Sequence, residues 1–362
     1  MVDVMRPDRA LILDGTPSPG VYLIEEKCDD PKLGSIERVG EGVWQIKGCS
    51  FTSPDLSKIA SRGDIVTISH SSRSIRTLLV KDSPNNTILV TEACENLCVF
   101  CSQPPKDSWH FFEEAAAAIR NFHTSCNVGI TGGEPTLYWE AFLEFCEDFS
   151  RNNKDKTLHI LTHGRNLAVD GRVDSLQGTN VLKQSVWGIP IHGSDSATHD
   201  AVTMRSNSFQ ETIDGALNLA FAGAAIEFRI IVCSLNYRSI PKIVELLGTL
   251  FAGANKYIAV MQLEPMGYAK NRYEDLFVPP DEQERYLVEA YKISRAKKTS
   301  LVFYNYPLCH LPLQLRRAAT KSISDWKNYF PEACVQCKFK DECCGFFSSA
   351  KGSKLEKPRP IT

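Results

Sequence analysis

The chain has 362 residues, of which 43% are hydrophobic and 23% charged, and its formal net charge at pH 7 is −2. This balance excludes a global basic field for nucleic acid and an acidic, disordered chain, so we expect a globular protein without a nucleic-acid partner. The first residues contain no apolar run long enough for a signal peptide, and no stretch reaches the roughly 18 apolar residues of a membrane span. We therefore expect a cytoplasmic protein with no membrane association.

The amino-terminal 85 residues contain short apolar runs broken by turn residues, such as "GVYLIEE", "GVWQIKG" and "GDIVTISH". This spacing predicts a small β-rich segment over 1–85, ending near the turn-like stretch "KDSPNNT". We expect the segment to be a structural flank. The alternative is a leader-peptide site that works by strand addition to a sheet edge.

Strands alternate with helices over 86–299. We expect strands at 87–91, 127–131, 158–162, 185–192, 226–233 and 257–263. Apolar residues at helical spacing predict helices in "FFEEAAAAIRNFH", "YWEAFLEFCEDFSR", "SFQETIDGALNLAFAG" and "IPKIVELLGTLFAG". The alternation indicates an α/β fold with a parallel sheet, either open or curled into a partial barrel, whose ligand site lies at the carboxyl ends of the strands.

The composition changes near residue 300. "LVFYNYPLCH" suggests one more strand, and cysteines gather among charged and aromatic residues, so we expect a Cys-rich extension over 300–350. The last residues, 351–362, have the composition of a flexible tail.

Thirteen cysteines in a reducing compartment are unsuited to disulfides. Clustered cysteines indicate metal or cluster ligands, and scattered ones indicate small buried hydrophobes. We expect the second role for Cys28, Cys49, Cys126, Cys146 and Cys233.

The first cluster, Cys94, Cys98 and Cys101, directly follows the first strand of the alternating region. Three thiolates on one loop can hold three irons of a cubane cluster and leave the fourth iron for a substrate or cofactor. The alternative is a zinc site completed by a distant residue. The second strand ends in "GITGGEPTL", where two glycines allow the main chain to approach a ligand closely.

Together, "CENLCVFC" and "GGEP" resemble the two motifs of the radical S-adenosylmethionine (SAM) superfamily. The resemblance implies a partial (β/α)6 TIM-type barrel, with a [4Fe-4S] cluster on the three cysteines and SAM on its open iron. It also implies that Phe100 lies near the adenine and that Gly132, Gly133 and Glu134 receive the methionine amino group. SAM would be cleaved to a 5′-deoxyadenosyl radical that abstracts hydrogen, so no catalytic residues are required beyond the cluster and SAM.

The block "IPIHGSDSATHDAVTMRSNSFQETIDGALNLAFAGAAIEFRIIV" extends the resemblance. It suggests His192 and Ser194 for the ribose, and Arg229 and Arg205 for the methionine carboxylate. Each of these has an ordinary structural alternative, as a helix cap or an ion-pair partner. Two departures from the family pattern are Met204, where many relatives have glycine, and "THG" at 162–164, where "TNG" is frequent.

The second cluster contains Cys309, Cys334, Cys337 and Cys343, with Cys344 as a spare that could replace Cys343. Four thiolates suit either a second iron–sulfur cluster or structural zinc. The pattern resembles the SPASM and twitch extensions of radical SAM maturases, which implies an auxiliary [4Fe-4S] cluster.

The carboxyl-terminal motifs resemble the shorter of two maturases of the His-Xaa-Ser system. This implies post-translational modification of a small peptide or protein substrate, an electron donor such as flavodoxin or ferredoxin, and a companion radical SAM maturase. Two alternatives remain: a radical SAM enzyme acting on RNA or a small molecule, and a non-enzymatic iron–sulfur or zinc module.

Overall fold

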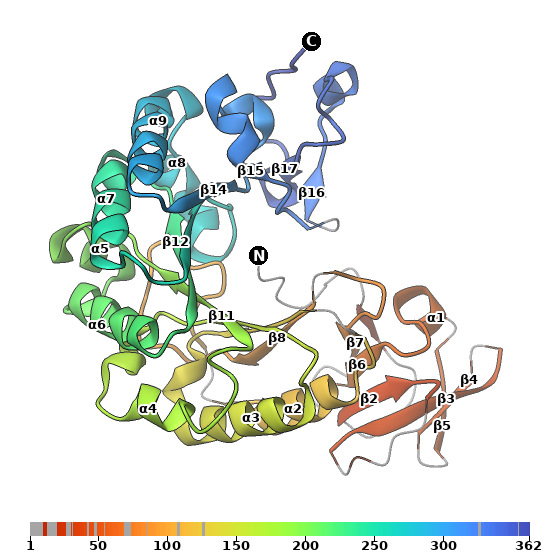
Figure 1. Cartoon of the computed structure of the whole chain (residues 1–362). Helices are drawn as coiled ribbons and strands as arrows, with labels where there is room; N and C mark the ends of the chain where they lie inside the picture. Colours follow the sequence, from red (N-terminus) through yellow and green to blue (C-terminus); the bar gives the residue numbers. More distant parts are fainter. Residues whose placement is uncertain are drawn as a thin grey trace.

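The computed structural model describes residues 10–12, 20–26, 30, 32–41, 43–46, 49–53, 55–68, 74–84, 86–106, 109–124, 127–324, 327–353 and 355–362. Their strands form two large sheets and one two-stranded sheet. Figure 1 shows the parallel sheet curving through the centre, between the amino-terminal strands and the carboxyl-terminal extension.

The amino-terminal sheet has seven strands in the order β1-β7-β6-β2-β3-β4-β5. Successive side chains on a strand point to opposite faces. Accordingly, Tyr22 and Ile24 pack in a separate small core, while Val21 and Leu23 join the main core of the molecule. The elements are β1 (Ala10–Ile12), β2 (Gly20–Ile24), β3 (Gly34–Gly40), β4 (Val43–Ile46), β5 (Cys49–Thr52), α1 (Leu56–Ile59), β6 (Ile65–Ile68) and β7 (Ser74–Leu79).

The second sheet has eight strands in the order β15-β14-β13-β12-β11-β10-β9-β8, and every neighbouring pair is parallel. All six predicted strands and the additional one near residue 300 are confirmed. The bounds are β8 (Asn86–Thr91), β9 (Val128–Gly132), β10 (Leu158–Leu161), β11 (Ser185–Pro190), β12 (Ala225–Ile231), β13 (Lys256–Met261), β14 (Ser300–Tyr304) and β15 (Ala319–Thr320).

The four predicted helices are confirmed as α2, α3, α6 and α7. Gly223 and Gly253, just beyond α6 and α7, have φ angles of 80° and 83°, the left-handed conformation that glycine adopts without steric cost at helix ends. The helices are α2 (Phe112–Arg120), α3 (Trp139–Asn152), α4 (Arg172–Leu176), α5 (Ser196–Thr203), α6 (Ser208–Phe221), α7 (Ile240–Leu250), α8 (Tyr273–Leu276) and α9 (Pro280–Ala296).

The helices lie on the outer, convex side of the parallel sheet, and the strands line its inner side (Figure 1). In this mixed α/β arrangement, consecutive strands are neighbours and all carboxyl ends lie at one edge. The arrangement is consistent with a partial TIM-type fold. Among the described strands, β8 and β15 are the two ends of the sheet and do not pair with each other.

Two of the scattered cysteines, Cys146 and Cys233, are fully buried as expected. Cys28 and Cys126 lie outside the described residues, as does the side chain of Cys49. None of the helices in the described parts of the chain has both the length and the apolar composition that crossing a membrane requires.

The carboxyl-terminal extension contains the short strands β16 (Asn328–Tyr329) and β17 (Phe346–Phe347), which pair antiparallel. The final segment differs from the flexible tail predicted from its composition. Residues 355–362 pack against the body of the molecule, and Glu356 is only 5% exposed. A segment rich in lysine and proline is therefore held by specific contacts that its composition does not reveal.

Candidate functional site

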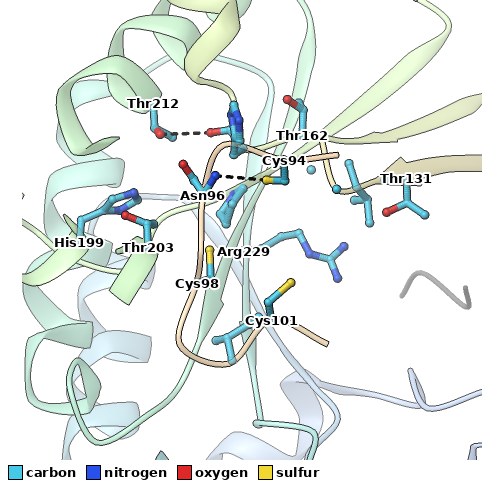
Figure 2. A pocket seen from close by; sticks show the side chains of 17 residues that line it. Cys94, Asn96, Cys98, Cys101, Thr131, Thr162, His199, Thr203, Thr212 and Arg229 are labelled. Carbon is cyan, nitrogen blue, oxygen red and sulfur yellow. Dashed lines mark hydrogen bonds between the residues drawn. The ribbon is translucent and has the colours of Figure 1, made fainter. Parts of the chain in front are cut away.

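A cavity of about 190 Å³ lies at the carboxyl ends of the parallel strands. Cys94, Cys98 and Cys101 line it from the loop after β8, and Figure 2 shows the three side chains on this one loop, with Arg229 beside them. Gly132 and Gly133, at the end of β9, line it as well. The structure thus brings together the two motifs that are separated by a strand and a helix in the sequence.

The cysteine loop is held by main-chain hydrogen bonds to two other segments. Leu97 N–H donates to Thr203 O (3.1 Å) and Val99 N–H donates to Val202 O (2.9 Å), both at the end of α5. On the other side, Tyr268 N–H donates to Cys101 O (2.9 Å). These bonds attach the main chain of the cysteine loop to the end of α5 and to the segment around Tyr268.

Gly133 is required by the close packing of its turn against the cysteine loop. A Cβ atom at this position would lie 2.2 Å from the carbonyl oxygen of Ala93. Gly133 N–H donates to Thr91 O (2.8 Å), and the next residue, Glu134, donates its N–H to Ala93 O (2.7 Å). The turn and the cysteine loop therefore form one rigid unit.

The Glu134 carboxylate is fully buried, does not line the cavity, and is occupied by protein donors. It accepts hydrogen bonds from Thr136, from the Thr162 hydroxyl (2.6 Å) and from His163 N–H (2.7 Å). Its side chain therefore joins the end of β9 to the end of β10, and a contact of Glu134 with the methionine amino group stays a prediction.

His163, the departure from the family pattern in "THG", lies beside the first cysteine. Its Nδ1 lies 3.1 Å from Arg165 N and 3.2 Å from Glu134 Oε2, and its Nε2 forms a hydrogen bond with Glu95 Oε2 (3.1 Å). Burial raises the pKa of the Glu95 carboxyl, but the hydrogen bond with His163 outweighs burial and lowers this pKa to about 2. Cys94, Glu95 and His163 together offer ligand atoms within 4.8 Å of one another.

Arg229 on β12 also lines the cavity, beside the cysteine side chains (Figure 2). Its Nη1 lies 3.4 Å from Glu227 Oε1, and His159 Nε2 on β10 lies 2.7 Å from Glu227 Oε2. Glu227 is fully buried. Burial raises the pKa of Glu227, but the charge of Arg229 and the contact with His159 outweigh burial and lower this pKa to about 2. The carboxylate is therefore ionised and holds the guanidinium at the cavity wall.

The other predicted site residues lie outside the cavity lining. Phe100 and His192 are buried and their rings meet edge to face, with centroids 5.0 Å apart. Ser194 Oγ contacts Asp195 Oδ2 (3.3 Å), and Arg205 is exposed. Of the two arginines suggested for the SAM carboxylate, only Arg229 lines the cavity.

The sequence analysis missed several residues that line the cavity. Most of them lie in the last residues of strands or just after them, a position that signals a ligand site in this class of fold. Asn96, within the cysteine motif, bonds to Arg165 Nη1 through its side-chain oxygen (2.9 Å). The missed lining residues are Asn96, Thr131, Leu161, Thr162, His163, Gly188, Pro190, His199, Thr203, Thr212 and Ile231.

The three cavity-lining thiols fit an iron–sulfur cluster better than a single ion. A tetrahedral zinc ion with Zn–S bonds near 2.3 Å brings its sulfurs to roughly 3.8 Å from one another. Among the described residues, the three sulfurs do not form such a compact group. Burial raises the pKa of Cys98 to about 12 and also raises that of Cys94 and Cys101, so metal binding would have to displace their protons.

The carboxyl-terminal cysteines lie near one another. The sulfur of Cys309 interacts electrostatically with those of Cys334 and Cys343, and Cys334 interacts with Cys337. Burial raises the pKa of Cys309 to about 11. Cys343 differs, because a contact with Cys344 and two main-chain N–H groups lower its pKa to about 6.

Comparisons with known proteins agree with the site geometry. Residues 88–247 match the family model described as the Radical SAM superfamily. Streptococcus suis SuiB bound to S-adenosylmethionine is 17% identical, with 60% of this chain and 49% of that chain covered and a TM-score of 0.47. A radical SAM methyltransferase from Sphaerobacter thermophilus is 15% identical, with 66% and 72% covered and a TM-score of 0.48.

Native anSMEcpe with bound AdoMet and the Kp18Cys peptide is 16% identical, with 59% and 62% covered and a TM-score of 0.46. The chain spans about half the length of SuiB. With TM-scores below 0.5, none of these likenesses assigns a substrate to this chain, and no curated protein matches it. The part of the chain that is similar to the Radical SAM superfamily, residues 88–247, contains the three cavity cysteines and the Gly132–Gly133 turn.

Proposed function

We propose that the protein is a radical SAM enzyme that cleaves SAM reductively and abstracts hydrogen from a peptide or protein substrate. The observation that carries the enzymatic part is the shared cavity of the cysteine triad and the Gly132–Gly133 turn, within a radical SAM domain. When bound, the cluster and SAM supply the one-electron cleavage and the hydrogen-abstracting group.

The protein's own residues bind and orient these groups. Cys94, Cys98 and Cys101 would hold three irons, and the exposed main chain of Gly132 and Gly133 would receive the methionine amino group. Arg229, the cationic side chain that lines the cavity beside the cysteines, would pair with the methionine carboxylate. The buried surroundings strengthen these contacts because they exclude water.

Anaerobic reconstitution tests the enzymatic part directly. With dithionite, the wild-type chain is expected to release 5′-deoxyadenosine from SAM, whereas a variant with all three cavity cysteines replaced by alanine is expected to release none. Cleavage at the same rate in both proteins would contradict the proposal. A matched control is Cys146→Ala, because Cys146 is buried in the core and does not line the cavity.

The peptide substrate is supported by the resemblance of the carboxyl-terminal motifs to maturases of the His-Xaa-Ser system. The auxiliary cluster in this proposal would lie on Cys309, Cys334, Cys337 and Cys343, whose sulfurs interact with one another. An auxiliary cluster suits peptide oxidation, since a substrate radical must pass on its electron. The partners proposed are a flavodoxin- or ferredoxin-like donor and a companion maturase.

A substrate test combines the reconstituted enzyme, SAM and a reductant with a short peptide containing His-Xaa-Ser repeats. Mass spectrometry is expected to show loss of hydrogen from the peptide. The amount of SAM cleaved is expected to rise in proportion to the amount of peptide modified. SAM cleavage that stays uncoupled from this peptide would leave the enzymatic part intact and contradict the peptide class.

One observation favours a second candidate, a metal-binding module without radical chemistry. Cys94, Glu95 and His163 form a compact group that would suit a single metal ion. His163→Ala separates the candidates: a mononuclear site would lose its metal, whereas a cubane on the three cysteines is expected to keep about four irons.

A further inference from the structure

The loop after β10 bonds to two successive residues of the cysteine motif. His163 Nε2 forms a hydrogen bond with Glu95 Oε2 (3.1 Å), and Arg165 Nη1 donates to Asn96 Oδ1 (2.9 Å). The main-chain N–H of Asn96 also donates to the Cys94 sulfur (3.4 Å), as the dashed line in Figure 2 shows. Asn96 is therefore bonded both to the first cysteine of the motif and to Arg165.

Helix α6 holds the Arg165 side chain in place. Arg165 is buried, and its Nε donates to Glu211 Oε2 on α6 (2.6 Å). Asn207, the residue before α6, donates through its side chain to the other oxygen of the same carboxylate (3.1 Å). The helix packs directly on the loop, because a Cβ at Gly215 would lie 2.0 Å from the carbonyl oxygen of Gly164. The guanidinium is thus fixed between α6 and the cysteine loop.

The fixed guanidinium determines how the Asn96 side chain is oriented. Arginine has only donor groups, so the atom of the Asn96 amide that bonds to it must be the carbonyl oxygen. The amide nitrogen, Nδ2, is then the end left for another partner, and among the described residues none accepts its hydrogens. Asn96 is only 4% exposed and lines the cavity. The cavity wall therefore contains a hydrogen-bond donor that the described part of the protein does not use.

We propose that Asn96 binds SAM by donating a hydrogen bond from Nδ2 to one of its oxygens, and that Arg165 is the positioning residue that orients this amide. The inference rests on the proposed function, since it takes SAM to be the ligand of the cavity. SAM offers acceptor oxygens in its carboxylate and in its ribose. Asn96 lines the same cavity as the three cysteines and is bonded to one of them, so the amide and the cluster that holds SAM would share one cavity.

The alternative role of Asn96 and Arg165 is to brace the cysteine loop without contacting SAM, and one substitution separates the two roles. Asn96→Asp keeps the size of the side chain and an oxygen for Arg165, and a carboxylate accepts from a guanidinium more strongly than an amide does. The substitution removes the donor, however, and would set a negative oxygen against the acceptor oxygen of SAM. A bracing role predicts unchanged or tighter SAM binding in this variant, whereas the proposed donor predicts weaker binding.

The test measures iron content and, by anaerobic calorimetry, the dissociation constant of SAM for the reconstituted full-length proteins. The variants are Asn96→Asp, Asn96→Ala, Arg165→Gln and the double variant of the last two. Arg151→Gln is the matched control, since Arg151 is exposed near the end of α3. The thermal unfolding midpoint of each cluster-free protein shows whether the fold is kept. Competition with methionine and with 5′-methylthioadenosine shows whether the bonded oxygen is in the carboxylate or in the ribose.

We expect Asn96→Asp to keep the wild-type iron content and unfolding midpoint, while its dissociation constant for SAM rises about tenfold or more. Arg165→Gln alone should raise this constant severalfold but should add nothing to the effect of Asn96→Ala, because Arg165 acts through that amide. Arg151→Gln should match the wild type. The Asn96 variants should lose affinity for only one of the two competitors, the one that contains the bonded oxygen.

Unchanged or tighter SAM binding in Asn96→Asp would overturn the donor role, as would loss of iron from this variant, because its bond to Arg165 is retained. Additive effects of the two substitutions in the double variant would overturn the positioning role of Arg165. A wild-type protein that holds its iron and binds no SAM would contradict the proposed function together with this inference. If the wild type binds and cleaves SAM and both Asn96 variants bind it equally well, only this inference fails.

Discussion

Arg229 and Glu227 lie on the same face of β12, two residues apart, with Nη1 of the arginine 3.4 Å from Oε1 of the carboxylate. Arg229 lines the cavity, while Glu227 is fully buried and also contacts His159. An ionised Glu227 therefore holds the cation where an anionic ligand group can reach it.

Arg229→Ala is expected to weaken SAM binding to the reconstituted protein. Hydrogen bonds to a charged partner contribute about 2 kcal/mol, so the dissociation constant should rise roughly 30-fold. Isothermal calorimetry with SAM measures the change. Arg205→Ala is the control, since Arg205 is exposed outside the cavity. Weaker binding in the Arg205 variant and unchanged binding in the Arg229 variant would reverse the assignment.

Gly133→Ala is expected to damage both stability and cluster binding. The added Cβ would lie 2.2 Å from the Ala93 carbonyl oxygen, so the turn or the cysteine loop must move. Such overpacking costs about 1–3 kcal/mol, and it displaces the loop that carries Cys94. Thermal unfolding and iron content measure the two effects.

Gly178→Ala is the matched control for that substitution, because the nearest atom to its Cβ would be 3.9 Å away. Wild-type stability and iron content in Gly133→Ala would show that the turn tolerates a side chain, contrary to the close packing found here.

The sequence was sufficient to predict the parts of the site that follow strands. The strand and helix periodicities placed the cysteine loop and the Gly132–Gly133 turn at the same edge of a parallel sheet, as observed. The choice between Arg205 and Arg229 could not be made in this way. Both are arginines in the same block, and only the three-dimensional structure shows that Arg205, just after α5, is exposed.

Long-range contacts account for the remaining differences. Glu134 belongs to the family motif, but its carboxylate is taken by Thr162 and His163, which lie 28 and 29 residues away. Tyr268 supports the cysteine loop from even farther along the chain. No local pattern encodes such a pairing, since it depends on which loops meet at one edge of the sheet.

The sulfurs of Cys343 and Cys344 differ in their hydrogen bonds, and on this ground we propose Cys343 as the fourth auxiliary ligand. The Cys343 sulfur accepts hydrogen bonds from Leu308 N–H (3.3 Å) and Gly345 N–H (3.4 Å), whereas the Cys344 thiol donates to Gly345 O (3.4 Å). A sulfur that accepts two N–H hydrogen bonds, as that of Cys343 does, is suited to bind metal as a thiolate. We expect Cys343→Ala to hold about four irons and Cys344→Ala about eight. Iron analysis with the opposite result would assign Cys344.

Glu356 is expected to make the stability of the protein depend on pH. Burial and the charge of Glu264 raise the pKa of Glu356 to about 7, and among the described residues its Oε2 has no hydrogen-bond partner. The unfolded chain releases this proton near pH 4.5, whereas the folded chain keeps it until about pH 7. The free energy of unfolding should therefore fall by up to about 3 kcal/mol as the pH rises through this window.

The contribution of Glu356 is isolated by comparison with Glu356→Gln, which cannot ionise. Anaerobic urea unfolding of both full-length proteins at several pH values between 5 and 8 measures the difference. We expect the wild type to lose stability relative to the glutamine variant as the pH rises, because only the wild type must bury a charge. Glu289→Gln removes an exposed carboxylate and is expected to leave this pH dependence unchanged. Parallel stability curves for the wild type and Glu356→Gln would show that Glu356 ionises in the folded protein as it does in the unfolded chain.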